Sequence, residues 1–197
     1  MGELGDIGPR LREERERVGI SQRELARRLG LSASLISQIE SDQSKPSVST
    51  LYAIVTELGV SLDHVFQVHE FEGTASEPTG VEGSGPVVRP DERHVIELAS
   101  GVRWERLTSH HHEDVDFLHV VYDVGGASAP EERMMRHRGR EYGVVLSGRL
   151  CVQLGFERHE LGPGDSIAFD STQPHRLWND GDEPVHGVWF VVGRSGQ

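Results

Sequence analysis

The stretch from Ser21 to Pro46 constrains the fold more than any other, because it carries the start and stop signals of two short helices. Glu24 follows Ser21 at the spacing of a capping box, in which each side chain accepts a hydrogen bond from a backbone N–H at the helix start. Gly30 provides a left-handed helix cap, and Ser32 can begin the next helix. The apolar positions at helical spacing are Leu25, Ala26, Leu29, Leu35, Ile36 and Ile39. This pattern predicts two helices packed across a tight turn.

The opposite face of the second predicted helix carries short uncharged side chains beside one amide. These residues are Ala33, Ser34, Ser37 and Gln38. Such a surface can enter the major groove of DNA and contact base edges, and a glutamine pairs most naturally with adenine. The alternative is an amphipathic helix pair whose polar face is only solvated.

Three further helices are expected around this pair. The first begins near Asp6 and turns Ile7, Leu11 and Val18 inward. After Pro46, a fourth helix should run to Gly59, because apolar residues recur at i, i+3, i+4 and i+7 from Leu51. A last short helix begins at Ser61 to Asp63 and buries Val65 and Phe66. The prediction is an all-α domain of five helices over residues 1–68.

This region resembles the helix-turn-helix of the XRE family, the phage-repressor type, over about residues 7 to 66, with the motif at 21–40. The matching residues are Ser21, Gln22, Glu24, Leu25, Ala26, Gly30, Ser32, Ile36, Ser37, Ile39, Glu40 and Pro46. The resemblance implies a lambda-repressor-like fold. It also implies that Gln22 lies near a phosphate and that Lys45 contacts the DNA backbone. The residues facing the bases would be Ser32, Ala33, Ser34, Ser37 and Gln38. Asp42 departs from the usual neutral residue and should weaken DNA binding locally.

Charge is distributed unevenly along the chain. The net charge is −12, of which residues 1–68 carry −2 and the remainder carries −10. Phosphate repels an acidic domain, so the second part is expected to hang away from DNA. Cys151 is the only cysteine, so no intrachain disulfide can form. With no signal peptide and no apolar run long enough for a bilayer, the sequence predicts a cytoplasmic protein without membrane contact.

The second part of the chain has the pattern of a β domain. Residues 69–90 are rich in Gly, Pro, Ser, Thr and Glu and predict a linker. From Val95 onward, short β-branched or aromatic runs alternate with glycine-rich turns. Residues 91–197 are therefore expected to form an antiparallel jelly roll or barrel that can hold a ligand, giving an α+β chain of two domains.

Three segments of this domain resemble the sequence motifs of the cupin family over residues 115–192. They are His137 to Gly148, Leu161 to Asp165 and Gln173 to Asn179. The resemblance implies an RmlC-like jelly-roll barrel in which His137, Glu141 and His175 are metal ligands. Many cupins place a further ligand histidine two residues before His137, where this chain has Met135.

Two imidazoles and one carboxylate suit a divalent metal. This set is typical of Fe(II), and it can also hold Zn, Mn or Ni. The alternative is that the three residues form hydrogen bonds in a metal-free pocket for a small molecule. The expected pocket residues are Met135, Tyr142, Arg149, Phe169 and Trp178. The run from His110 to His112 predicts an exposed loop rather than a metal site, and Cys151 a buried, inert thiol.

Together these features predict a transcriptional regulator. A homodimer would bind an inverted repeat in double-stranded DNA, and a small-molecule effector in the cupin would modulate operator affinity. One alternative is an iron-dependent cupin oxygenase or epoxidase with a vestigial helix-turn-helix head. Another is a DNA-binding module whose cupin serves only for dimerisation.

Overall fold

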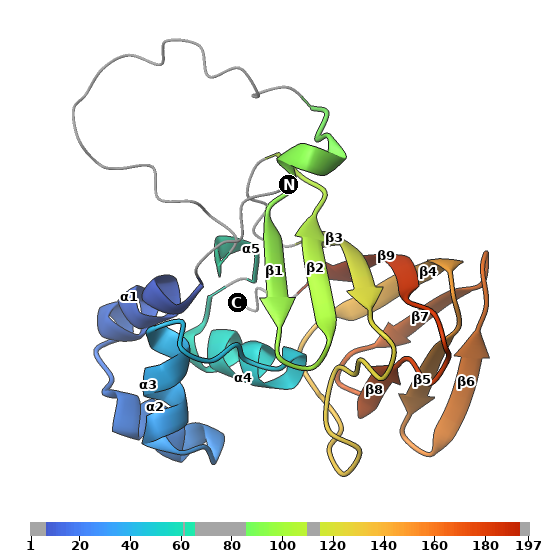
Figure 1. Cartoon of the computed structure of the whole chain (residues 1–197). Helices are drawn as coiled ribbons and strands as arrows, with labels where there is room; N and C mark the ends of the chain where they lie inside the picture. Colours follow the sequence, from blue (N-terminus) through green and yellow to red (C-terminus); the bar gives the residue numbers. More distant parts are fainter. Residues whose placement is uncertain (1–6, 61, 66–85, 110–114, 194–197) are drawn as a thin grey trace.

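The computed structural model describes residues 7–60, 62–65, 86–109 and 115–193, and it places a helical head beside a β domain (Figure 1). The head contains α1 (Gly8–Val18), α2 (Gln22–Leu29), α3 (Ala33–Glu40), α4 (Val48–Leu58) and α5 (Leu62–Val65). Four of these are helices of eight or more residues, whereas α5 is a four-residue turn. The predicted five-helix head is therefore corrected to four helices and one short turn. None of the described helices is long and apolar enough to cross a membrane.

The predicted helix signals form the caps of α2 and α3. The Oγ of Ser21 accepts a hydrogen bond from Glu24 N at 3.1 Å, and that of Ser32 accepts one from Leu35 N at 3.1 Å. Gly30 has the left-handed conformation expected of it. Only half of the capping box forms, because the Glu24 carboxylate instead accepts hydrogen bonds from the guanidinium groups of Arg27 and Arg28.

Two predictions about the first helix have different outcomes. Ile7 and Leu11 are buried as expected. Val18 is exposed, because the helix ends there and the chain turns away at Gly19. Asp6, the predicted cap, and Phe66 lie outside the described residues.

A buried ion pair joins α1 to the C-terminal end of α3. Arg15 Nε donates to Glu40 Oε1 at 2.6 Å, and Arg15 Nη2 donates to Oε2 at 3.0 Å. Gln22 Nε2 also donates to Glu40 Oε2, at 2.8 Å. Removing one partner of such a pair leaves a buried charge uncompensated, so these contacts fix α1, α2 and α3 as one unit.

The β domain consists of two antiparallel sheets. The six-stranded sheet has the order β1-β2-β3-β9-β4-β7 and the three-stranded sheet the order β6-β5-β8. The strands are β1 (Val95–Leu98), β2 (Val102–Arg106), β3 (Val115–Tyr122), β4 (Arg140–Ser147), β5 (Leu150–Leu154), β6 (Glu157–Leu161), β7 (Ser166–Asp170), β8 (His175–Trp178) and β9 (Val185–Val192), with a 3₁₀ turn η1 (Pro90–Glu92) before them. Side chains from both sheets line one central cavity, as expected of a cupin.

The head is joined directly to the β domain through α4 and the segment that precedes it (Figure 1). Ser49 N donates to Ser128 O at 2.9 Å, and Ala99 N donates to Pro46 O at 3.0 Å. The ammonium group of Lys45 pairs with the carboxylate of Glu97 on β1. Most of the predicted linker lies outside the described residues. The two domains are in direct contact at this junction, where main chains meet.

Candidate functional site

The surface predicted to read DNA lies on α3, away from the β sheets (Figure 1). Ser34, Ser37 and Gln38 are exposed, while Ile36 and Ile39 on the opposite face are buried. Across the described residues, the side chains of these three polar residues form no hydrogen bond. The geometry therefore leaves one amide and two hydroxyl groups available to a ligand.

The other predicted DNA contacts already have structural partners. Ser32 caps α3, and Ala33 packs partly against the core of the head. Gln22 donates to Glu40, and Lys45 pairs with Glu97. A phosphate would have to compete with these carboxylates for the Gln22 amide and the Lys45 ammonium group.

Asp42 has a structural role that its place in the motif does not reveal. Its Oδ1 accepts a hydrogen bond from Gly8 N at 2.9 Å, at the start of α1. Ile7, the residue at the N-cap of α1, provides no side-chain cap, so a carboxylate from beyond α3 serves instead. A Cβ on Gly8 would lie 2.3 Å from Ile39 O, which explains a glycine at this close approach.

The β domain brings the three predicted metal ligands together. The ligand atoms of His137, Glu141 and His175 all lie within 4.8 Å of one another. Glu141 Oε1 is 3.0 Å from His137 Nε2 and 3.2 Å from His175 Nε2. All three atoms are buried, yet none has a partner in hydrogen-bonding geometry. Buried polar atoms are almost always paired, so three that converge on one point indicate a site for a ligand.

In each of the two histidines, the ring nitrogen that faces away from the cavity contacts a backbone carbonyl oxygen. His137 Nδ1 lies 3.1 Å from Arg138 O, and His175 Nδ1 lies 2.9 Å from Gln173 O. Because a carbonyl oxygen only accepts, each Nδ1 carries a proton, and in the neutral form of each ring Nε2 presents a lone pair to the cavity. Outer hydrogen bonds of this kind orient the histidine ligands of metal sites.

The carboxylate of Glu141 is held in the same way. Its Oε2 accepts a hydrogen bond from Trp189 Nε1 at 2.8 Å. Burial raises the pKa of Glu141, but the His137 and His175 rings lower it more, so the net pKa lies below its ordinary value. Burial lowers the pKa of His175, and Glu141 outweighs it, so that pKa is raised. The cluster therefore presents an anionic oxygen between two imidazoles.

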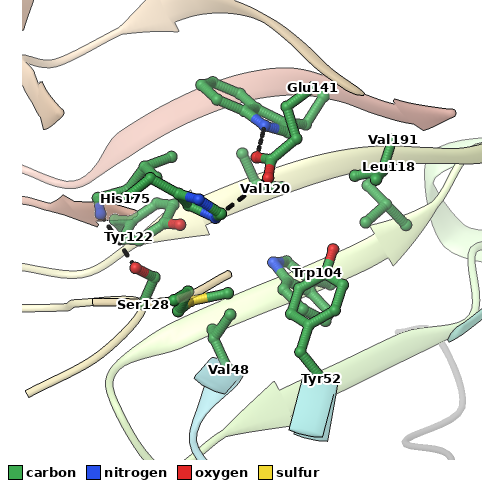
Figure 2. A pocket seen from close by; sticks show the side chains of 13 residues that line it. Val48, Tyr52, Trp104, Leu118, Val120, Tyr122, Ser128, Glu141, His175 and Val191 are labelled. Atoms are coloured by element: carbon green, nitrogen blue, oxygen red, sulfur yellow. Dashed lines mark hydrogen bonds and ion pairs between the residues drawn. The ribbon is translucent and has the colours of Figure 1, made fainter. Parts of the chain in front are cut away.

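Helix α4 of the head closes the cavity on the side opposite Glu141 and His175, with Val48 and Tyr52 among its lining residues (Figure 2). The Tyr52 ring stacks on the His137 ring, with centroids 4.4 Å apart and planes inclined by 2°. It also meets Trp104 edge-on at 5.5 Å. The enclosed space offers about 20 Å³ to the centre of a water-sized sphere. This is room for about one water molecule or one metal ion.

The predicted effector-pocket residues divide into two groups. Met135 lines the cavity, and Phe169 is buried against the His175 ring at 5.1 Å. The structure corrects the other three. Tyr142 is 42% exposed, because Glu141 and Gly143 take the inward positions on β4. The Arg149 side chain is 55% exposed, and Trp178 lies on the outer face beneath the guanidinium groups of Arg158 and Arg176.

Several residues of the cavity were not predicted from the sequence. Trp189 could have been found from the alternation along β9, where it shares the inward side with Val191. No sequence pattern indicates that Tyr52 lines the cavity, because its position depends on how the head packs against the β domain. Cys151 is buried as predicted, and burial, followed by a hydrogen bond to Asp180, raises the pKa of its thiol. The run from His110 to His112 lies outside the described residues.

Comparison with known proteins identifies both parts of the chain. Residues 11–65 match the helix-turn-helix family model, and residues 118–191 match the cupin domain model. The HTH-type transcriptional regulator PuuR of Escherichia coli (strain K12) is 30% identical over 173 residues, covering 87% of this chain and 86% of PuuR. The chain belongs to the helix-turn-helix transcriptional regulators with a cupin domain.

Other relatives agree with this assignment. The E. coli (strain K12) regulator SutR is 26% identical to this regulator over 176 residues, covering 89% of this chain and 88% of SutR. A crystal structure of an HTH_3 family transcriptional regulator from Vibrio cholerae superposes with a TM-score of 0.65 and 23% identity, covering 96% of each chain, and shows a shared fold. Whole-length similarity to regulators supports the regulator prediction over the enzyme alternative.

Gly143 is required by the packing that holds Glu141. A Cβ at this position would lie 2.1 Å from the Trp189 ring. We expect Gly143→Ala to lower the free energy of unfolding by about 1–3 kcal/mol, because Trp189 must shift from its place. Gly162→Ala is the matched control, since its Cβ would approach only the Asp165 carboxylate, at 3.8 Å. Denaturant unfolding measures both variants, and equal stability would contradict this packing role.

Proposed function

We propose that this regulator binds a double-stranded DNA operator in the cytoplasm through the exposed face of α3. The observation that carries the proposal is the set of Ser34, Ser37 and Gln38, whose side chains project from a helix fixed by the Arg15–Glu40 pair. Side chains held this firmly can discriminate between bases, because the register of the helix in the groove is set by the head as a whole.

The proposal includes a homodimer that places two α3 helices on the halves of an inverted repeat. The outer face of the six-stranded sheet carries an aromatic row that suits pairing with a second copy. Phe117 stacks on Phe190 at 4.3 Å, and Phe190 in turn pairs in register with Tyr142 on β4. Phe190 and Tyr142 are exposed, and apolar surface of this kind is typical of interfaces.

Selection of random DNA duplexes by the full-length protein tests this reading. We expect enrichment of a palindromic sequence with half-sites about one helical turn apart. Gln38→Ala should relax the preference at one base pair of each half-site, by about tenfold, because it removes a two-bond contact to a base. Gln173→Ala, an exposed position of the β domain, is the control and should select the same sequence as the wild type.

Two results would refute operator reading by α3. One is the absence of any enriched sequence, with or without added Mn²⁺. The other is an identical preference in the Gln38→Ala and wild-type selections.

We further propose that His137, Glu141 and His175 hold one divalent metal, such as Fe, Zn, Mn or Ni. Three observations support a metal here. The three ligand atoms are buried without hydrogen-bonding geometry, and the Nδ1 contacts direct the Nε2 atoms of both histidines toward the cavity. The cavity itself has the size of one ion. The metal would supply a positive charge that balances the Glu141 carboxylate between the two imidazoles. The residues themselves orient the site and exclude water from it.

Thermal unfolding with each metal tests this part. A metal that binds only the folded protein stabilises it by about 2.7 kcal/mol at one hundred times its Kd, so the melting temperature should rise. His175→Ala should abolish that metal-induced rise, whereas His159→Ala, an exposed histidine on β6, should retain it. Because the shift is compared within each variant, a cost of the substitution to folding cancels. A rise that survives in His175→Ala would contradict the assignment.

A further inference from the structure

A second hollow lies between the head and the β domain. It offers about 220 Å³ to the centre of a water-sized sphere, about ten times the space of the cavity at His137. Its lining residues come from the α2–α3 region, from α4 and from one segment of the β domain, and they include Leu29, Leu31, Tyr52, Ala53, Arg133 and Arg136. This interdomain groove is large enough for a small organic molecule, which the inner cavity is not.

The groove has a definite chemical character. Leu29, Leu31 and Ala53 supply apolar surface, and Arg133 and Arg136 supply two cations. Among the described residues, no acidic side chain lines the groove, and neither guanidinium group forms a hydrogen bond or an ion pair. Both arginines are exposed, and in a chain of net charge −12 two cations without an ion pair favour a negatively charged ligand.

The groove and the inner cavity share a wall. Tyr52 and Met135 line both spaces. Tyr52 covers His137 on one side, and the main chain of Met135 forms two hydrogen bonds with that of His175, at 2.8 and 3.0 Å. A ligand in the groove would therefore contact Tyr52 and Met135, the two residues that separate it from the cluster of His137, Glu141 and His175.

The same groove touches the DNA-reading helices. Leu29 ends α2, and Leu31 lies in the turn that leads to Ser32 and α3. A ligand here contacts both the turn of the helix-turn-helix and α4, without any intervening element. A ligand shifts an equilibrium only if it interacts differently with the two states, and contact with the element that moves provides such a difference.

We propose that the interdomain groove binds a small organic acid through Arg133 and Arg136, and that its occupancy shifts the α2–α3 pair relative to the β domain. Acid binding is inferred from the residues of the groove alone. The regulatory effect also rests on the proposed operator binding. The acid group pairs with the two guanidinium groups, and the apolar body lies on Leu29, Leu31 and Ala53.

Calorimetric titration of the full-length protein tests the binding half. The probes are acetate, benzoate and 4-phenylbutyrate, each compared with its uncharged primary amide. We expect at least one acid to bind at millimolar concentration and its amide to bind about tenfold or more weakly, because the amide cannot pair with a guanidinium group.

Variants then locate the site. Arg133→Ala and Arg136→Ala should each weaken binding of the acid about tenfold, and Ala53→Leu should abolish it by filling the groove without changing charge. Arg140→Ala, an exposed arginine that does not line the groove, removes the same charge and should have no effect. The site is refuted if no acid binds, if acid and amide bind equally, or if both arginine variants bind as the wild type does.

The regulatory half is tested with the selected operator duplex and fluorescence anisotropy. Saturating acid should change operator affinity several-fold in the wild type and not in Ala53→Leu, in which the groove is filled. Unchanged affinity in the wild type would refute the coupling while leaving the binding site in place. If selection yields no operator, the proposed function fails, and the calorimetry still tests acid binding in the groove independently.

Discussion

The stacking of Tyr52 on His137 is the side-chain contact that sets the head against the cavity of the β domain, beside the backbone hydrogen bonds at Ser49 and Ala99. Tyr52 lies on α4, whose other side belongs to the core of the head through Leu51, Ile54 and Val55. One helix therefore completes the hydrophobic core of the DNA-binding domain and also closes the cavity of the cupin. Because packed interiors transmit displacement rather than absorb it, α4 cannot leave the cavity without moving the head.

The cavity beneath this helix is arranged for binding. Glu141 Oε1 faces two imidazole nitrogens at 3.0 and 3.2 Å without hydrogen-bonding geometry, whereas buried polar groups elsewhere are almost always hydrogen-bonded. Trp189 and two backbone carbonyls hold the outer sides of these residues, so the ligand atoms cannot turn away to find other partners. The groove on the other side of Tyr52 differs from this cavity. It is larger and carries positive charge, but no buried unpaired polar group lines it among the described residues. Two adjoining sites of different size and chemistry thus contact the same helix.

Much of this arrangement could be predicted from sequence, where the signal is local. The caps at Ser21 and Ser32 and the spacing of His137, Glu141 and His175 depend on residues within a turn or a motif. The sequence is less informative about residues whose position depends on packing between distant segments. Tyr142 and Trp178 were expected in the pocket, but strand alternation turns them outward. Tyr52, Asp42 and the groove depend on contacts between segments far apart in the chain, which periodicity along one segment does not reveal.

The most direct test of this account is the distance distribution between spin labels on the head and on the β domain. Labels at Ser34→Cys on α3 and Glu157→Cys on β6, where the Glu157 side chain is 82% exposed, in a Cys151→Ser background, report the relative position of the domains. The account predicts one narrow distribution when Tyr52 is present and a broad one in Tyr52→Ala, with far-UV circular dichroism unchanged. An equally narrow distribution in Tyr52→Ala would contradict the claim that Tyr52 fixes the head on the cupin.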